Sequence, residues 1–245
     1  MRIITYECLE STNITAKEMA LSGAEHGLVI TANRQTAGRG RYGRSFFSPE
    51  NHGLYMSVIL HSEQICMKTP TLITAFTAVS VCEAIEAITN IKLQVKWVND
   101  VIYGGKKVCG ILTETVTLLD IPSSQRFIVG IGINISTPKA GYPDDIKNSA
   151  GSLFGFETPP VTAQQLALEI CMRIAHPKNP VHEPDILEKY KKRMFLLGKK
   201  VSISTTGDTY DAIAEDIDDS GRLVVRKDSG ELLSLFEGDI NLNYS

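Results

Sequence analysis

Residues 27–60 read GLVITANRQTAGRGRYGRSFFSPENHGLYMSVIL, in which two apolar runs enclose a loop rich in glycine and arginine. The runs GLVITAN (27–33) and GLYMSVIL (53–60) are rich in β-branched and large apolar residues, a composition typical of strands. The loop holds four of the ten arginines of the chain and no acid: Arg34, Arg39, Arg41 and Arg44. We therefore expect a sheet that presents one concentrated positive loop.

The glycines of this loop indicate that it binds an anion. Gly38, Gly40 and Gly43 permit positive φ and let backbone N–H groups approach a ligand closely. Arginine adds a forked, permanent cation that suits phosphate or carboxylate. The spacing matches neither the P-loop nor the G-x-G-x-x-G pattern. We expect the loop to order around its ligand as a lid, and a basic loop that serves only solubility is the alternative.

The overall composition limits the classes of partner. The net charge is −3 and the isoelectric point lies near 6.0, which argues against a protein whose whole surface binds nucleic acid. Five scattered cysteines without a C-x-x-C spacing are typical of reduced thiols rather than of disulfides or a zinc site. We expect no signal peptide and no segment with the roughly 20 apolar residues that cross a membrane. The expected location is cytoplasmic.

The apolar patterns elsewhere predict a mixed sheet with flanking helices over residues 1–197. Further strands are expected from Arg2, at 93–97 and at 126–135, and the last of these is apolar on both faces and therefore central. A hairpin should turn at Gly104-Gly105. Helices are expected from Thr12 to Leu21 and at 70–88, 162–175 and 183–196, with a proline- and glycine-rich connector over 136–160.

Residues 198–245 have a different rhythm. Turn signals recur about every ten residues, at 206–208, 219–221 and 228–230, and they separate short alternating runs. This spacing predicts a second, small domain of about five strands, a barrel or sandwich, that begins at Gly198.

A second group of polar residues surrounds the predicted hairpin. KWVND (96–100) precedes it, and GGKKVCGILTE (104–114) places Lys107 just after the turn. Taken alone, Lys106 and Lys107 are typical of solvated edge-strand residues, and Asn99-Asp100 is typical of a turn cap. These residues gain a functional interpretation only together with the arginine loop.

The ordered motifs resemble those of the biotin protein ligases, also called biotin–[acetyl-CoA-carboxylase] ligases. They are EST-N (10–13), Q-x-x-GRGRxGR (35–44), KWxND (96–100), GxKxxGILxE (105–114) and GIGIN (130–134). The resemblance runs from about residue 3 to 245. It implies an α+β fold in which a catalytic domain like that of class II aminoacyl-tRNA synthetases (1–197) precedes a small SH3-like β barrel (198–245).

The resemblance also implies an activity. Biotin attacks ATP to form biotinyl-5'-AMP, and a lysine of a biotin carboxyl carrier protein then takes the biotin. The resemblance implies ATP and biotin as substrates and Mg²⁺ as the cofactor. It implies no metal site formed by protein ligands. The longer relatives begin with a DNA-reading domain, whereas here a catalytic strand begins at residue 2, so no DNA binding is expected. A monomer or a weak, ligand-dependent homodimer is the expected state.

The site residues carried over from the family fall into three groups. The implied biotin contacts are Ser11, Thr12, Asn13, Gln35, Gly38, Arg39, Gly40, Arg41, Lys107 and Gly110. The implied nucleotide contacts are Arg41, Arg44, Phe46, Lys96, Trp97, Asn99, Asp100, Gly132 and Asn134. The implied catalytic residues are Lys107, Arg39, Arg41 and Asp100, with Asp100 either orienting and deprotonating the incoming amine or serving a structural or metal-side role.

This sequence departs from the family pattern at three points. Val98 replaces a usual proline, and Phe46 stands where many relatives have tryptophan. Near the C-terminus Asn243 takes the place of an arginine that touches the nucleotide in some relatives, so we expect no firm nucleotide contact from the small domain.

Three other functions compete with this interpretation. A lipoate–protein ligase would activate another carboxylate on a related fold. A non-catalytic nucleic-acid binder would use the arginine loop as a basic patch, although only Tyr42 is aromatic within 34–44. A catalytically inactive regulator would retain the fold, but the intact Arg39, Arg41, Lys107 and Asp100 argue against it.

Overall fold

The computed structural model describes residues 2–65, 67, 70–118, 121–177, 181–204, 209–236 and 238–242. Its larger part is a seven-stranded mixed sheet with the order β1-β2-β3-β7-β6-β5-β4. β1 and β2 are parallel and all other neighbours are antiparallel. The strands are β1 Ile3–Leu9, β2 Val29–Gln35, β3 Gly53–His61, β4 Gln94–Lys96, β5 Asp100–Tyr103, β6 Lys106–Leu118 and β7 Ile121–Asn134.

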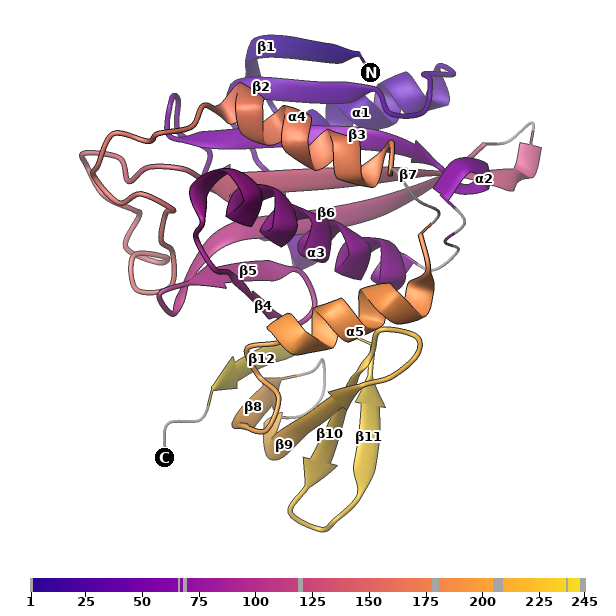
Figure 1. Cartoon of the computed structure of the whole chain (residues 1–245), viewed down its shortest axis with the longest axis vertical. Helices are drawn as coiled ribbons and strands as arrows, with labels where there is room; N and C mark the ends of the chain where they lie inside the picture. Colours follow the sequence, from indigo (N-terminus) through magenta and orange to yellow (C-terminus); the bar gives the residue numbers. More distant parts are fainter. Residues whose placement is uncertain are drawn as a thin grey trace.

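Helices cover both faces of this sheet, as predicted. Figure 1 shows α3 and α4 across one face and α1 behind the other. The helices are α1 Thr12–Leu21, α2 Ser62–Ile65, α3 Pro70–Thr89, α4 Ala163–Ile174 and α5 Glu183–Arg193. Along β3, Met56 and Val58 pack into the α3 and α4 core, whereas Ile59 packs with α1 on the opposite face. The period-2 alternation of a strand thus divides one apolar run between two cores.

β7 alternates in a way that makes room for a site. Its isoleucines Ile131 and Ile133 point into the α3 core, and they alternate along the strand with Gly130 and Gly132. Because successive residues of a strand face opposite sides, both glycines face the side that carries α1. The GIGIN motif therefore leaves that face of the central strand without side chains at two positions.

The smaller part is a five-stranded antiparallel sheet with the order β11-β10-β9-β8-β12. Its strands are β8 Lys200–Ser204, β9 Thr209–Ile217, β10 Leu223–Lys227, β11 Leu232–Leu235 and β12 Asp239–Leu242. The all-β character predicted for this region is confirmed. The turn predicted at 206–208 and the position of Asn243 lie outside the described residues.

The segment between β4 and β5 contacts both the smaller part and helix α5 of the larger part. The indole Nε1 of Trp97 donates to the carbonyl of Gly221 at 3.0 Å, and the hydroxyl of Tyr190 donates to the carbonyl of Val98 at 2.7 Å. Both hydrogen bonds are buried, so each one satisfies a carbonyl group that water does not reach. The peptide bond between Trp97 and Val98 is cis.

The element boundaries differ from the sequence expectations by a few residues. α5 ends at Arg193 rather than near 196, because the chain turns there to pair Phe195 N–H with the carbonyl of Val95. α1 begins after Ser11 as predicted, but the hydroxyl of Ser11 makes no capping hydrogen bond. β7 extends further toward its N-terminus than the predicted 126–135.

The expectation that no segment is apolar enough to cross a membrane is wrong for α3. Among the described residues, Thr71–Thr89 is the one helix that is long and apolar enough to cross a membrane, judged by length and composition alone. However, 72% of its most apolar window is buried inside the protein, and the helix packs against the sheet, α4 and α5. A single helix of this kind is weak support for a membrane span, and its burial agrees with the predicted role as a core helix.

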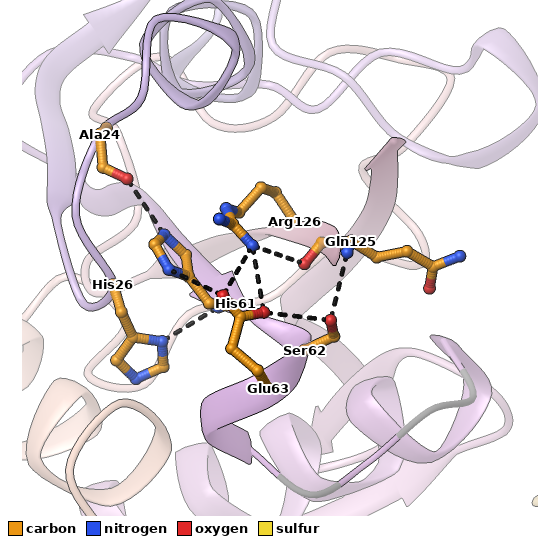
Figure 2. Close-up of polar contacts among 7 residues, drawn as sticks. All are labelled: Ala24, His26, His61, Ser62, Glu63, Gln125 and Arg126. Atoms are coloured by element: carbon orange, nitrogen blue, oxygen red, sulfur yellow. Dashed lines mark hydrogen bonds and ion pairs between the residues drawn. The ribbon is translucent and has the colours of Figure 1, made fainter. Parts of the chain in front are cut away.

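A histidine cluster lies where β3 ends, next to the loop between α1 and β2, and Figure 2 shows the contacts of His26 and His61 with each other and with Ala24. His26 lies between α1 and β2. Its Nδ1 accepts the backbone N–H of His61 at 3.0 Å, and its Nε2 lies 3.0 Å from the carbonyl of Ala175 at the end of α4. His61 Nε2 in turn lies 3.0 Å from the carbonyl of Ala24. The N–H of His61 uses the lone pair of His26 Nδ1, so the ring of His26 is held in its neutral form.

Charged groups also face this cluster. Glu63 lies 3.7 Å from His61 Nδ1 and pairs with Arg126 at 3.1 Å, and the His176 ring contacts His26 edge-on. Burial is the main cause that lowers the pKa of both His26 and His61. In the unfolded chain a histidine titrates near 6.5, so as pH falls below about 6.5 the unfolded chain takes up protons that the folded protein does not.

We therefore expect the urea unfolding midpoint to fall between pH 7.5 and 5, and the slope of this fall to be smaller in His26→Asn. Asparagine Oδ1 can still accept the His61 N–H but cannot be protonated. His182→Asn is the matched control, because His182 is largely exposed and lies outside the cluster. An identical pH slope in wild type and His26→Asn contradicts the assignment.

Candidate functional site

A cavity of about 540 Å³ lies at the face of the sheet that carries α1. It is enclosed by the arginine loop, the start of α1, the β5–β6 hairpin and the smaller β part. Most of the residues carried over from the resemblance meet in its wall: Ser11, Thr12, Asn13, Gln35, Arg39, Gly40, Arg41, Arg44, Phe46, Lys96, Trp97, Asn99, Asp100, Lys107, Gly110 and Gly132. Segments as far apart in the sequence as those of Ser11 and Gly132 are therefore brought to one place by the sheet.

Two of the expected site residues do not line this cavity. Gly38 is buried inside the loop, and a Cβ there would lie 2.4 Å from the carbonyl oxygen of Phe46 and 2.7 Å from Ser48 Oγ. Glycine at this position thus lets the loop fold onto its own backbone. The amide of Asn134 donates to the carbonyl of Gly151 at 2.9 Å. The ligand contacts expected of these two residues stay predictions.

A polar network forms one end of the cavity. Gln35 Oε1 accepts the backbone N–H of Thr12 at 2.8 Å, and Gln35 Nε2 donates to Ser48 Oγ at 2.9 Å. The buried Ser57 Oγ lies 2.8 Å from Thr12 Oγ1 and 2.6 Å from Asn13 Oδ1. This end therefore offers fixed hydrogen-bonding groups to a polar ligand rather than an apolar surface.

The arginine loop is a small hairpin closed by its own backbone. Gly40 N–H donates to the carbonyl of Arg44 at 2.7 Å, and Phe46 N–H donates to the carbonyl of Gly38 at 2.8 Å. These two N–H groups are used inside the loop, so the guanidinium groups carry more of the anion-binding potential than expected. Arg41 donates to the hydroxyl of Tyr42 at 2.7 Å and lies over that ring. The expected ordering of the loop around a ligand stays a prediction.

Phe46 forms a wall of the cavity beside the glycines of β6 and β7. A Cβ at Gly132 would lie 2.5 Å from Phe46 Cε1, and one at Gly110 would lie 3.1 Å from Phe46 Cε2. The ring also packs edge-on against Tyr55. Only glycine at position 132 allows the ring this close to the strand.

Lys107 and Asp100 form the ion pair at the opposite wall, with 2.6 Å between Lys107 Nζ and Asp100 Oδ1. The backbone of Lys107 is held on both sides, because its N–H donates to the carbonyl of Ser149 and its carbonyl accepts from Gly151 N–H. Both side chains are partly exposed. The neighbouring Asn99 uses its amide to donate to the carbonyl of Ile111 at 2.8 Å, which fits the structural interpretation of this residue.

Sequence reasoning missed the contribution of the smaller part. Gly238, Ile240, Asn241 and Leu242 line the cavity, and Asn241 Oδ1 accepts from Lys96 Nζ at 3.4 Å. The expectation of no firm contact rested on Asn243, which lies outside the described residues. The strand just before it reaches the cavity instead. No local pattern announces this contact, because it depends on how the two parts pack.

The chemistry of the wall suits anionic ligands. Among the described residues that line the cavity, five carry a cationic side chain (Arg39, Arg41, Arg44, Lys96 and Lys107) and one carries a carboxylate, Asp100. Burial raises the pKa of the neighbouring Cys109 well above its usual value, so this thiol is not a nucleophile. Within the described ranges no three His, Cys, Asp or Glu side chains are grouped to hold a metal. The expected Mg²⁺ stays a prediction, and Asp100 is the carboxylate of the described lining that could contact an ion held mainly by the ligand.

Two family models match this chain. Residues 5–134, more than half of the chain, match the model of the biotin/lipoate A/B protein ligase family. Residues 196–242 match the model of the biotin protein ligase C terminal domain.

Individual relatives match nearly the whole chain. The bifunctional ligase/repressor BirA of Bacillus spizizenii is 33% identical over 98% of this chain and 74% of its own length. The biotin–[acetyl-CoA-carboxylase] ligase of Mycobacterium tuberculosis is 29% identical over 94% of this chain and 85% of its own.

Solved structures match as well. The biotin protein ligase of Aquifex aeolicus in complex with biotin and ATP has a TM-score of 0.80 and 28% identity, covering 100% of this chain and 99% of that one. The fold, the site and these matches together mean that the chain belongs to the biotin/lipoate A/B protein ligase family, as a ligase of the biotin protein ligase group.

Proposed function

We propose that this enzyme joins biotin and ATP into biotinyl-5'-AMP and then transfers the biotinyl group to a lysine of a biotin carboxyl carrier protein. One observation carries the proposal. Arg39, Arg41 and Lys107 converge on a cavity whose other end is a polar network built on Thr12 and Gln35. A single cavity thus offers hydrogen bonds to a polar ring and positive charge to the groups that must react.

The first step brings two anions together. The carboxylate of biotin attacks the α-phosphorus of ATP, a P–O bond to pyrophosphate breaks, and negative charge builds on the phosphate oxygens. Arg39, Arg41 and Lys107 offset the repulsion and stabilise that charge, because they are already in place before the reaction. Mg²⁺ bound with ATP supplies further charge neutralisation. Asp100 holds Lys107 at 2.6 Å until the substrates arrive.

The second step needs protection from water and a neutral amine. The mixed anhydride of the adenylate is prone to hydrolysis, so the arginine loop serves to retain it until the carrier lysine attacks. The lysine nitrogen bonds to the biotinyl carbonyl carbon and AMP leaves. In our scheme Asp100 orients the incoming amine and accepts its proton. No protein nucleophile takes part, in line with the buried, protonated Cys109.

The polar end of the cavity favours biotin over lipoate. Biotin carries a urea with two N–H donors and one carbonyl acceptor, whereas the dithiolane ring of lipoate has none of these groups. Thr12 and Gln35, which line this end of the cavity, offer polar atoms that a urea can hydrogen-bond and a dithiolane cannot. The match of residues 196–242 to the C-terminal domain of biotin protein ligases supports the same choice.

The test is incubation of the purified protein with ATP, Mg²⁺, biotin and a biotin carboxyl carrier domain. We expect a mass increase of one biotinyl group on one carrier lysine, with pyrophosphate released in equal amount. Lipoate in place of biotin, and omission of ATP, are the controls. Equal modification by lipoate, or no modification at all, contradicts the proposal.

Lys107→Ala is expected to lower the rate of pyrophosphate release by about 10²–10³-fold, because one preorganised charge donor is removed from the transition state. The variant should stay folded, since the Lys107 side chain is partly exposed. Lys106→Ala is the matched control on the same hairpin, because its ammonium contacts only the carbonyls of Lys147 and Asn148. A rate near that of wild type in Lys107→Ala contradicts the assigned role.

Arg41→Ala should release the adenylate before the carrier lysine captures it. The guanidinium lies in the cavity wall and stacks on Tyr42, so its loss removes both charge and cover from the intermediate. We expect biotin to appear on lysines of an unrelated bystander protein, measured by blotting with streptavidin. Arg34→Ala is the control, because Arg34 is exposed and does not line the cavity. Bystander labelling at the wild-type level counts against a lid function for Arg41.

A further inference from the structure

Glu114 lies on β6 beside the cavity without lining it, and its side chain is 26% exposed. Its carboxylate contacts two residues that do line the cavity. Oε2 accepts from Asn13 Nδ2 at 2.8 Å, and Oε1 lies 3.8 Å from Arg39 Nη1. One carboxylate therefore joins the start of α1 to the arginine loop.

The first contact is the shorter of two that orient the amide of Asn13, because Asn13 Nδ2 also donates to the carbonyl of Leu112 at 3.4 Å. An ionised carboxylate only accepts hydrogen bonds, so it selects the NH₂ end of the amide. The oxygen end is then directed to Ser57 Oγ, 2.6 Å away. The amide has little room to move, because a Cβ at Gly130 would lie only 2.2 Å from Asn13 Oδ1. Without the negative charge of Glu114, the selection of the NH₂ end would be left to the longer contact with the Leu112 carbonyl.

The consequence of this orientation spreads along the polar end of the cavity. From Ser57 the contacts continue to Thr12, and from Thr12 to Gln35 Oε1. Gln35 Nε2 donates to Ser48 Oγ, which donates to the carbonyl of Phe46 at the base of the arginine loop. The donor and acceptor pattern that a ligand meets here is thus set at one end by Glu114.

The second contact acts on the loop. The pair between Glu114 and Arg39 is 3.8 Å long and half of the Arg39 side chain is exposed, so the attraction is weak. A carboxylate or phosphate in the cavity can therefore replace Glu114 as the partner of Arg39 at a small cost in free energy. The contact places the guanidinium of Arg39 beside the carboxylate that also binds Asn13.

We propose that Glu114 is a positioning residue for biotin: it orients the Asn13 amide for the urea of biotin and holds Arg39 beside the site, without touching the substrate. This inference rests on the proposed function. It assigns a role to the last residue of the GxKxxGILxE motif that charge stabilisation by Arg39, Arg41 and Lys107 does not explain.

The test is calorimetric titration of biotin into Glu114→Gln. Glutamine has the same shape but presents an NH₂ group as readily as an oxygen, so the preference of the Asn13 amide for one direction is weakened to what the Leu112 carbonyl supplies. We expect the Kd of biotin to rise about tenfold, which corresponds to about 1.4 kcal/mol. The KM for biotin should rise with it, while the kcat of pyrophosphate release and the KM for ATP stay unchanged.

Glu7→Gln is the matched control, because Glu7 also accepts from an asparagine amide, that of Asn33 at 2.7 Å, but lies away from the cavity. Equal biotin affinity in wild type and Glu114→Gln overturns this inference but leaves the proposed function intact. A parallel loss of biotin and ATP binding with a lower unfolding midpoint assigns Glu114 to stability and also overturns it. If wild type itself binds no biotin, the proposed function fails and the inference falls with it.

Discussion

The site depends on the absence of side chains at three strand positions, Gly110, Gly130 and Gly132. Two neighbouring strands, β6 and β7, face the cavity there with bare backbone, and Gly110 lies directly opposite Gly132 in the register. A methyl group at Gly132 or Gly130 would collide with Phe46 or Asn13. The alternate residues of β7 are isoleucines that fill the α3 core, so one strand builds the core with one face and the floor of the site with the other.

Two carboxylates beside this site explain how several cationic side chains can be concentrated in it. Cations that share one cavity repel each other, and folding them together costs free energy unless partners are near. Asp100 pairs with Lys107, and Glu114 lies beside Arg39 from outside the cavity wall. Each carboxylate thus offsets a cation on one side of the cavity. The anions that the ligands bring would replace these internal partners, so binding exchanges one set of pairs for another.

Much of this architecture follows from local patterns. The apolar runs at 27–33 and 53–60, the turn at Gly104-Gly105 and the central strand near 126–135 all have a period or a turn chemistry that specifies them. What the patterns could not give is the role of individual glycines and amides. Gly38 is required by the packing of the loop on itself, and the amide of Asn134 is used by Gly151. Those contacts join segments that are distant in sequence.

The smaller β part is the strongest case of this limit. Its strands can be predicted from the alternation of apolar and polar residues. No local pattern indicates that β12 reaches the cavity, or that the carbonyl of Gly221 accepts a hydrogen bond from the indole of Trp97. Trp97 belongs to a cavity-lining segment and also joins the two parts, because its ring is buried and its one donor is used. The position of Lys96, one residue before, therefore depends on both parts, and Asn241 of β12 contacts its ammonium. A wall that is shared in this way means that the cavity has its full shape only when the two parts are packed together.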